Sequence, residues 1–448
     1  MATTWTPTSW KSFPAAQQPE WPDERALDIT LEELRRLPPL VFAGEARALK
    51  DSLARAGRGE AFVLQAGDCA EAFDDFSADS IRDKLKIILQ MAVVLTYAAG
   101  MPVVKIGRIA GQFAKPRSAP SERSPDGTEL PTFRGHAVND FAFDEAARRA
   151  DPARLVRAYH QSAATLNLIR AFTKGGFADL NQIHVWNQEF VAASKQGQRY
   201  EAIARQIERA LRFMAACGID LDADQNLHEV DFYTSHEALL LGYEDALTRQ
   251  DSLTGDWYCC SAHLLWVGER TRQPGGAHLE FLSGIKNPVA CKLGASATPE
   301  EVVEICERLD PDGEPGRLTF ITRLGAANVE GVLPSLIGEV RRANHSAVWV
   351  CDPMHGNTFV TENGVKTRRL GDIMTEIKSF FAVHHQEGSV PGGVHLELTH
   401  EDVTECLGGA EEVLDHHLSE RYRALCDPRL NARQSLDLAF ELGEMLQQ

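Results

Sequence analysis

Pro288-Val-Ala-Cys-Lys-Leu293 is a short apolar run, and an amphipathic segment at residues 298–308 follows it. The pattern repeats in Leu318-Thr-Phe-Ile-Thr322, residues 328–342 and Ala347-Val-Trp-Val-Cys351. Short apolar runs bounded by polar residues are typical of buried strands, and apolar residues at a period of 3.6 are typical of helices. Strands that alternate with helices pair in parallel through right-handed crossovers. This part of the chain therefore predicts an α/β fold.

The alternation extends over most of the chain. Five further apolar runs have the same character: Ala61-Phe-Val-Leu-Gln-Ala66, Pro102-Val-Val-Lys-Ile106, Val230-Asp-Phe-Tyr233, His263-Leu-Leu-Trp-Val267 and Gly393-Val-His-Leu-Glu-Leu398. Eight strands of this kind are the number that closes a (β/α)8 TIM barrel, which is the fold that we predict. Periodicity alone does not distinguish the closed barrel from a doubly wound open sheet.

Two segments lie outside this repeat. We predict an N-terminal extension at residues 1–60 and the catalytic barrel at residues 61–448. The interval at residues 119–228, between the second and third strands, is too long for a simple connection. It contains helical patterns at residues 152–174 and 199–217. We therefore predict a long helical insertion there.

Composition excludes several classes of protein. The 448 residues carry a net charge of −18, which argues against nucleic acid or an anionic membrane as the main partner. No apolar run approaches the roughly 18–20 residues of a membrane span, and the first residues lack a secretory signal. The nine cysteines show no framework spacing, which is typical of a reducing compartment. We expect a cytoplasmic protein.

One loop reverses the acidic character of the chain. No carboxylate occurs between Asp83 and Glu122, and Gly107-Arg-Ile-Ala-Gly-Gln-Phe-Ala-Lys-Pro-Arg-Ser118 lies inside that gap. The loop carries three cations and a hydroxyl: Arg108, Lys115, Arg117 and Ser118. Cations at the point where a strand becomes a loop are well placed to bind an anionic small ligand. We predict an anion-binding loop.

Titratable residues follow the carboxyl ends of all eight predicted strands, where a barrel collects its ligand groups. In chain order they are Cys69, Arg108, Glu237, Glu269 with Arg270, Lys292, Arg323, His355 and Glu397. The four cations among them suit a ligand that carries both a carboxylate and a phosphate. Cys69, His355 and Glu397 form a mixed S/N/O set that suits a catalytic Mn, Fe, Co or Zn ion. Asp427 is a further candidate for this set.

Eight motifs carry a resemblance to a known family. They are Gln65-Ala-Gly-Asp-Cys-Ala-Glu71, residues 107–118, Ser235-His-Glu-Ala238, Trp266-Val-Gly-Glu-Arg-Thr-Arg272, Asn287-Pro-Val-Ala-Cys-Lys-Leu-Gly294, Cys351-Asp-Pro-Met-His-Gly-Asn-Thr358, His395-Leu-Glu397 and Cys426-Asp-Pro-Arg-Leu-Asn431. From about Trp5 to its C-terminus the chain resembles the type II 3-deoxy-D-arabino-heptulosonate 7-phosphate (DAHP) synthases. The resemblance implies a metal-dependent transferase of the shikimate pathway that condenses phosphoenolpyruvate with erythrose 4-phosphate and releases phosphate.

The resemblance also implies a role for each candidate residue. The implied metal ligands are Cys69, His355, Glu397 and Asp427, with Mn²⁺ or Co²⁺ favoured over Fe²⁺ or Zn²⁺. Phosphoenolpyruvate is expected to bind Arg108, Glu269, Arg270, Lys292 and Arg323. Erythrose 4-phosphate is expected to bind Lys115, Arg117, Ser118, Glu237 and Lys366. Lys292 is the expected proton donor or water-positioning group, and Cys69 and His355 are expected to serve catalysis through the metal.

Longer members of this family build subunit interfaces and feedback sites from such extensions and insertions. We therefore expect a homo-oligomer, a dimer or a tetramer, with an aromatic amino acid effector for which tryptophan is favoured. A chorismate mutase is a further candidate partner.

One departure from the family pattern is Phe133-Arg-Gly-His136, which has a histidine where the family pattern has an acid. Two alternatives stay open: an aldol-type synthase for another aldehyde phosphate, and a non-catalytic protein that binds aromatic metabolites.

Overall fold

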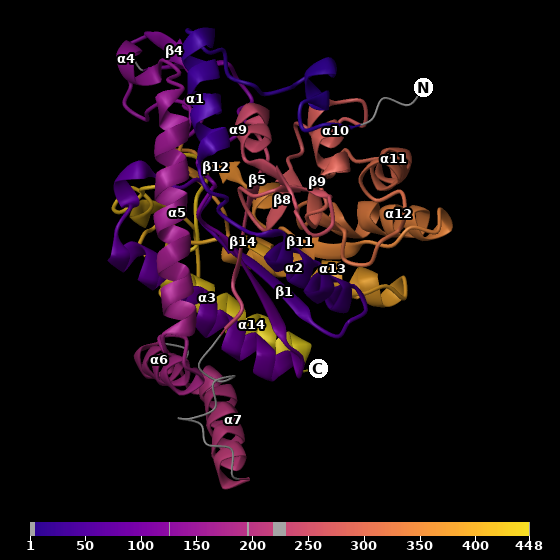
Figure 1. Cartoon of the computed structure of the whole chain (residues 1–448). Coiled ribbons are helices and arrows are strands. Elements are labelled where there is room, and N and C mark those ends of the chain that lie inside the picture. Colours follow the sequence, from indigo (N-terminus) through magenta and orange to yellow (C-terminus); the bar gives the residue numbers. More distant parts are fainter. Residues whose placement is uncertain (1–4, 125, 195–196, 218–229, 448) are drawn as a thin grey trace.

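A closed barrel of eight parallel strands forms the centre of the protein (Figure 1). The computed structural model describes residues 5–124, 126–194, 197–217 and 230–447. The barrel strands are β1 (Phe62–Gly67), β2 (Val103–Arg108), β5 (Tyr233–Glu237), β8 (Leu264–Val267), β9 (Val289–Gly294), β10 (Leu318–Arg323), β11 (Val348–Cys351) and β14 (Pro391–Glu397). Strand β1 pairs with both β2 and β14, which closes the sheet. The predicted (β/α)8 barrel is confirmed, and the open sheet is excluded.

Strand β5 is the one whose position differs most from the prediction. Its apolar run was expected at residues 230–233, whereas the strand covers Tyr233–Glu237. Its four polar side chains are buried, and Thr234 and Ser235 find partners on neighbouring segments of the barrel wall. Ser235 Oγ donates to the carbonyl of Gly107. The backbone N–H of Thr234 donates to His263 Nδ1 at 2.9 Å, and the Thr234 hydroxyl lies 3.1 Å from the same nitrogen. A search for apolar runs misses a strand of this composition.

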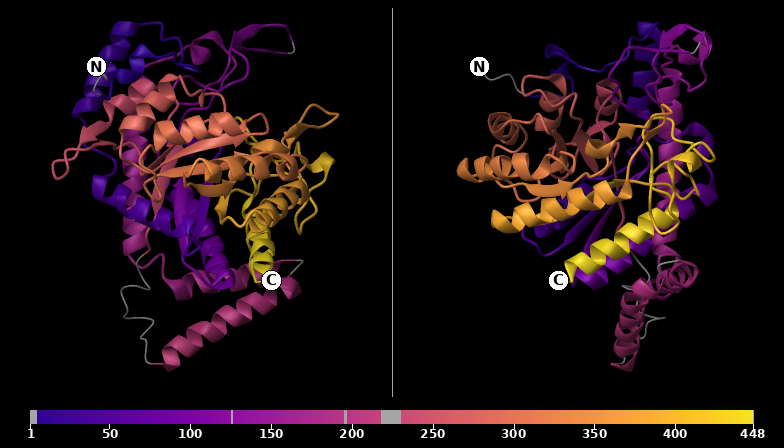
Figure 2. Two further views of the ribbon diagram at one scale, coloured as in Figure 1. Left: turned by 90° about the vertical axis from the view of Figure 1, so that its right-hand side faces the viewer. Right: turned by 180° about the vertical axis from the view of Figure 1, so that it is seen from behind.

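Helices surround the barrel (Figures 1 and 2). They are α3 (Ala78–Ala99), α9 (Leu241–Ala246), α10 (Ala277–Gly284), α11 (Pro299–Leu309), α12 (Val329–Arg342), α13 (Leu370–Gln386) and α14 (Ala432–Leu446). The two amphipathic segments predicted between strands, residues 298–308 and 328–342, form α11 and α12. Helix α10 was missed because its eight residues are too few to show a period. None of the helices in the described ranges is long and apolar enough to cross a membrane.

The N-terminal extension contributes to the barrel core. Helix α1 (Glu24–Arg36) packs against the insertion, and α2 (Ala43–Gly57) lies across one end of the barrel. From α2, Leu49, Leu53 and Ala56 are fully buried in the cluster that fills the barrel interior. Residues 1–60 therefore include a helix on which the barrel packing depends. Their predicted regulatory or interface role stays a prediction.

The insertion between β2 and β5 is mostly helical, as predicted. It contains the hairpin of β3 (Ser121–Arg123) and β4 (Glu129–Pro131), and the helices α4 (Glu145–Arg148), α5 (Ala153–Lys174), α6 (Leu180–Ala193) and α7 (Gly197–Ala216). The hairpin was not among the predicted elements of the insertion. Helices α6 and α7 lie below α3 and α14 in Figure 1, and they pack against these two helices through Val94, Tyr200 and Phe440. Residues 218–229, at the end of the predicted insertion, lie outside the described residues.

Glu376 on α13 holds the loops that follow β10 and β11. Its carboxylate accepts hydrogen bonds from the backbone N–H groups of Leu324 and Gly325, each at 2.9 Å, and from Asn357 Nδ2 at 2.7 Å. Burial raises the pKa of this carboxyl to about 7, the nearby Asp352 charge adds to the increase, and the three hydrogen bonds oppose it. In the folded protein the protonated form is therefore favoured below about pH 7.

This shift predicts a pH dependence of stability. Because the folded pKa lies above the usual 4.5, Glu376 stabilises the fold fully below about pH 4.5, and that contribution is lost as pH rises through about 7. The loss amounts to about 3 kcal/mol at most. We expect Glu376→Gln to flatten the change in chemical unfolding midpoint between pH 5 and pH 7.5, whereas Glu362→Gln, at an exposed position, should not. Identical pH profiles for wild type and Glu376→Gln would contradict this assignment.

Candidate active site at the carboxyl ends of the strands

Three side chains form a candidate metal site. His355, Glu397 and Asp427 present ligand atoms that all lie within 4.8 Å of one another. Glu397 ends β14, and His355 follows β11 in a short 3-10 turn. His355 Nε2 lies 3.1 Å from Glu397 Oε1 and 3.8 Å from Asp427 Oδ2. On the other side of the ring, Nδ1 donates to Asp352 Oδ2 at 2.7 Å. A carboxylate behind the imidazole is the arrangement that orients metal-binding histidines.

Lys115 shows that this centre favours positive charge. Its ammonium lies 3.3 Å from Glu397 Oε1 and 3.0 Å from Asp427 Oδ2. Burial by itself would raise the pKa of both carboxyls. The surrounding cations, Lys115 and the His355 ring among them, instead hold the pKa of Glu397 and of Asp427 well below the usual range. The buried Glu397 and the half-buried Asp427 stay ionised beside the imidazole of His355, a donor set that fits a divalent metal ion.

Cys69 is buried beside these residues, in the turn after β1. Burial raises the pKa of its thiol, Glu397 and Asp427 add to the increase, and Lys115 opposes it. Arg108 Nη2 donates both to the Cys69 carbonyl at 3.2 Å and to Glu397 at 2.8 Å, so the turn that carries the thiol lies at the same centre. Its sulfur is nevertheless not one of the three mutually close ligand atoms found in the described part of the chain. A metal ion would lower the thiol pKa, because coordination deprotonates a thiol.

The predicted cations for phosphoenolpyruvate surround the same centre. Arg108 is fully buried at the end of β2, and its Nη2 lies 2.8 Å from Glu397 Oε1. Lys292 Nζ, on β9, lies 2.8 Å from Asp352 Oδ2 and 3.3 Å from His355 Nδ1. Burial lowers the pKa of Lys292 to about 8, against the influence of the Asp352 carboxylate. Arg323 Nη2, at the end of β10, donates to the backbone carbonyl of His355 at 3.1 Å.

Glu237 and Glu269, the two glutamates predicted to bind substrate, have different hydrogen-bond partners. Glu237, at the end of β5, is buried, and its Oε1 has no hydrogen-bond partner among the described residues. Burial raises the pKa of this carboxyl, and the charges of Lys292, Lys115 and other nearby cations oppose the increase. Glu269 instead directs its carboxylate at neighbouring protein groups. It accepts hydrogen bonds from Gly294 N at 2.7 Å and from Arg272 at 3.0 and 3.1 Å. A ligand contact through its backbone stays compatible with this geometry.

The remaining predicted residues lie towards the rim of the site. Arg270 Nη2 donates to Ser118 Oγ at 2.6 Å, which joins the loops after β8 and β2. Lys366 Nζ donates to Asp427 Oδ1 at 2.6 Å. Arg117 Nη2 donates to Glu122 Oε1 of the β3–β4 hairpin at 2.7 Å. The structure therefore brings Lys366 to Asp427, one of the candidate metal ligands. The Arg117 guanidinium instead pairs with Glu122 of the insertion.

Sequence reasoning missed the acid that holds the cationic loop. Glu71 accepts hydrogen bonds from the backbone N–H groups of Ala110, Gly111 and Gln112 at 3.0, 2.8 and 2.8 Å. Ala110 adopts a left-handed conformation, with φ of 63°. The loop contains no carboxylate of its own, but a carboxylate from the turn after β1 shapes its backbone. Glu71 lies two residues beyond Cys69 inside a quoted motif, which was the available signal.

Several partners of the predicted residues were also missed, and most of them are close in sequence to a predicted residue. They are Asp68, Asp352, Arg368, His395 and Arg429. His395 Nε2 accepts from Arg108 Nη1 at 2.5 Å, and period-2 alternation from Glu397 would have identified it. His136, the departure from the family pattern, accepts the Phe73 N–H on Nδ1 at 2.7 Å. Its ring holds a loop near the site through the backbone.

Comparison with known proteins agrees with this geometry. The profile of the class-II DAHP synthetase family matches residues 5–443. A phospho-2-dehydro-3-deoxyheptonate aldolase of Streptomyces coelicolor (strain ATCC BAA-471 / A3(2) / M145) is 57% identical over 437 residues, which cover 98% of this chain and 96% of the relative. The phospho-2-dehydro-3-deoxyheptonate aldolase AroG of Mycolicibacterium smegmatis (strain ATCC 700084 / mc(2)155) is 50% identical over 438 residues, covering 97% and 93%.

A solved DAHP synthase structure is a more distant match. The crystal structure of the Thermotoga maritima enzyme is 14% identical, covers 87% of this chain and 70% of its own, and gives a TM-score of 0.39, which is too low to support an argument. The family profile and the two relatives, by contrast, extend over nearly the whole chain. The chain therefore belongs to the class-II DAHP synthetase family, and its activity is that of a DAHP synthase, a transferase.

Proposed function

We propose that the protein condenses phosphoenolpyruvate with erythrose 4-phosphate to give DAHP and inorganic phosphate, the first step of the shikimate pathway to aromatic amino acids. One observation carries this proposal. The buried cations Arg108, Lys115 and Lys292 converge on the His355–Glu397–Asp427 group. Two polyanionic substrates repel each other in water, so a site that joins them needs fixed positive charge on several sides.

Each substrate has a set of groups suited to its charges. We assign the carboxylate and phosphate of phosphoenolpyruvate to Arg108, Arg270, Lys292 and Arg323, with Glu269 contributing through its backbone. We assign erythrose 4-phosphate to Lys115, Arg117, Ser118 and Lys366. The unpartnered oxygen of Glu237 supports a role in accepting a hydrogen bond from a sugar hydroxyl, because a buried acceptor without a partner is costly.

The reaction then follows from the arrangement. A divalent metal held by Cys69, His355, Glu397 and Asp427, with Mn²⁺ or Co²⁺ favoured over Fe²⁺ or Zn²⁺, would supply Lewis acidity to the aldehyde oxygen. C3 of phosphoenolpyruvate attacks the aldehyde carbon, the new alkoxide takes a proton, water adds at C2 and phosphate leaves. We assign the proton transfer to Lys292, because burial lowers its pKa to about 8 and a general acid acts best when its pKa lies near the surrounding pH.

Substrate choice and metal dependence test this function together. Purified protein with Mn²⁺ is expected to consume phosphoenolpyruvate and release an equal amount of phosphate only when an aldose phosphate is present. Erythrose 4-phosphate should be preferred over three- and five-carbon analogues; the reverse preference would favour another aldol-type synthase. Chelation should abolish turnover, and added Mn²⁺ or Co²⁺ should restore it. Absence of turnover with every aldose phosphate would leave the non-catalytic alternative.

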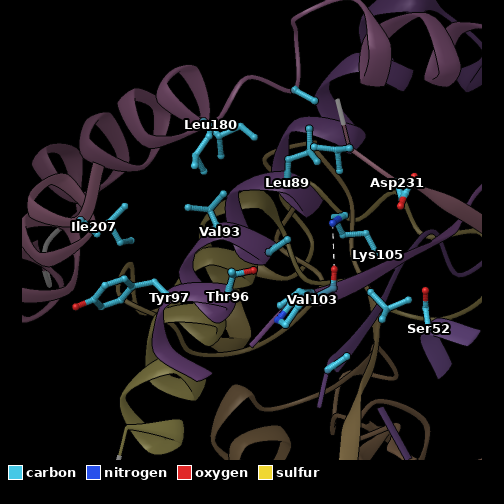
Figure 3. Close-up of a pocket in the computed structure, with 18 of the residues that line it drawn as sticks. Ser52, Leu89, Val93, Thr96, Tyr97, Val103, Lys105, Leu180, Ile207 and Asp231 are labelled. Atoms are coloured by element: carbon cyan, nitrogen blue, oxygen red, sulfur yellow. Dashed lines mark hydrogen bonds between the residues drawn. The ribbon is translucent and has the colours of Figure 1, made fainter. Parts of the chain in front are cut away.

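We further propose that an aromatic amino acid inhibits the enzyme, with tryptophan the favoured effector. A cavity of about 520 Å³ between barrel and insertion supports this proposal. Its apolar lining includes Leu89 and Val93 of α3, Leu180 of α6 and Ile207 of α7 (Figure 3). An apolar pocket with a few polar groups is typical of a small-molecule site.

Two of the charged groups that line the cavity, Lys105 and Asp231, match the carboxylate and the ammonium of a free amino acid. Lys105 and Asp231 lie at the same end, well apart from Tyr97 (Figure 3). Burial lowers the pKa of Lys105, against the influence of Asp231, and its ammonium donates to the carbonyl of Val103 at 3.0 Å. We assign the effector carboxylate to Lys105, the effector ammonium to Asp231, and the aromatic ring to the apolar wall.

Removal of the lysine charge tests this site. Lys105→Met is expected to raise the tryptophan concentration for half-inhibition by about tenfold or more, because a charge-assisted hydrogen bond contributes about 1.5–3 kcal/mol. The uninhibited rate should stay unchanged, and Lys378→Met, at an exposed position on α13, should change neither quantity. Activity that is insensitive to saturating tryptophan, phenylalanine and tyrosine, alone and combined, would remove the proposal.

We also propose a cytoplasmic homo-oligomer, a dimer or a tetramer, with interfaces formed by residues 1–60 and 119–228. The projecting helix α7 supports this, since its Phe213 is 69% exposed and an interface would cover it. All nine cysteines are free, as expected in a reducing compartment. Light scattering that gives the monomer mass would contradict the oligomer.

The proposal of a chorismate mutase partner rests on the family resemblance, and co-elution of the two proteins tests it.

A further inference from the structure

Arg368 is a buried charge to which nothing above assigns a function. It lies between β13 (Lys366–Thr367) and α13, and its side chain is fully buried. Its backbone is held as well: the carbonyl accepts the N–H of Leu407 at 2.8 Å. A buried guanidinium is costly unless its donors are paired, so its partners identify what it does.

The three partners of Arg368 belong to three different segments. Nη2 donates to Glu397 Oε2 at 2.9 Å, Nε donates to Thr358 Oγ1 at 3.0 Å, and Nη1 donates to the carbonyl of Pro428. Glu397 is itself a candidate ligand. Thr358 closes the turn that begins at His355, and Pro428 directly follows Asp427. One planar group therefore contacts every segment of the candidate metal triad.

The two oxygens of Glu397 have separate partners. Oε1 faces the centre, where His355 Nε2, Lys115 and Arg108 lie within 3.3 Å of it. Oε2 is bound from behind by Arg368. A guanidinium presents its donors in a rigid fork, so it fixes direction as well as distance. Arg368 thus turns Oε1 towards the centre while it contributes no ligand atom itself.

We propose that Arg368 is a positioning residue, which holds His355, Glu397 and Asp427 in the relative geometry that binds the metal. This inference rests on the metal site assigned under the proposed function. Groups that orient metal ligands usually change metal affinity by about 10- to 100-fold when they are altered. Lysine at position 368 would keep the positive charge but lose the fork, so it separates positioning from electrostatics.

The test measures metal binding without reference to turnover. Metal-free wild type, Arg368→Lys and Glu397→Gln are titrated with Co²⁺ against a chromophoric chelator, and the visible spectrum of bound Co²⁺ reports ligand geometry. We expect Arg368→Lys to bind Co²⁺ about 10- to 100-fold more weakly, with an altered spectrum. Thr358→Val, which removes one contact only, should give a smaller loss and covers the case in which Arg368→Lys does not fold.

Arg317→Lys is the matched control. Arg317 is also buried and donates to three backbone carbonyls, those of Leu282, Asn287 and Leu309, but it precedes β10 at the opposite end of the barrel. It should lower thermal stability and leave Co²⁺ affinity unchanged. Unchanged affinity and spectrum in Arg368→Lys and Thr358→Val, with a loss in Glu397→Gln, would overturn the positioning role alone. Unchanged affinity in Glu397→Gln would overturn the metal site and this inference with it.

Discussion

Lys292→Met is expected to lower kcat by about 10²- to 10⁴-fold, the usual contribution of a positioned acid or base. The ammonium of Lys292 lies 2.8 Å from Asp352 and 5.7 Å from the Trp266 ring centre, so methionine would fill a similar volume without a charge or a proton. The fold should survive. Asp352 keeps the His355 ring and the backbone N–H of Met354, at 2.7 and 3.0 Å, as partners.

Two further variants define the role of that lysine. Lys292→Arg keeps the charge but not the proton donor, because arginine stays protonated, so it should retain phosphoenolpyruvate binding better than turnover. Lys286→Met, at an exposed position just before β9, should behave as wild type. Rapid-quench measurement of a single turnover separates chemistry from product release. A single-turnover rate within about tenfold of wild type in Lys292→Met would exclude Lys292 as the proton donor.

Glu397→Gln is expected to lose both metal binding and stability. The carboxylate is in contact with Arg108, Lys115 and Arg368, and with the ring of His355. Removal of its charge would leave buried cations without compensation, a change that costs about 3–5 kcal/mol when a buried pair is broken. We expect the metal-free variant to melt at a lower temperature than wild type, and Co²⁺ affinity and kcat to fall by about 100-fold or more.

Glu376→Gln provides the comparison for that result. Glu376 is another buried glutamate at the same end of the barrel, but its carboxylate faces the Leu324–Gly325 backbone and Asn357. The variant should change the pH profile of stability and leave Co²⁺ affinity intact. Equal Co²⁺ affinity in Glu397→Gln and wild type would mean that the metal, if one is required, binds elsewhere.

Most of the barrel could be predicted from the chain because its signals are local. Eight apolar runs and the amphipathic segments between them correspond to the eight strands and to some of the helices that connect them. Errors arose where tertiary contacts override local pattern. Strand β5 buries Thr234 and Ser235 because partners on neighbouring strands satisfy them. Helix α2 was treated as part of an extension, yet its apolar face completes the barrel interior.

In the candidate site, too, the sequence indicated some of the residues and gave no signal for others. The residue types at the strand ends indicated anion binding and a mixed ligand set, since a (β/α)8 barrel gathers those ends at one face. Residues that act through another residue had no such signal. Glu71 shapes the loop of Lys115 through backbone hydrogen bonds, and Arg368 reaches Glu397 from a position that no strand-end argument selects.

The sequence by itself determined the order of strands and helices and the chemical groups that end each strand, because both depend on residues within a few positions of one another. Only the tertiary structure decided that the sheet closes, that Lys115 lies between Glu397 and Asp427, and that the two oxygens of Glu397 serve different partners. Those features join residues up to about three hundred positions apart, and the contacts exist only once the barrel brings the strand ends to one face.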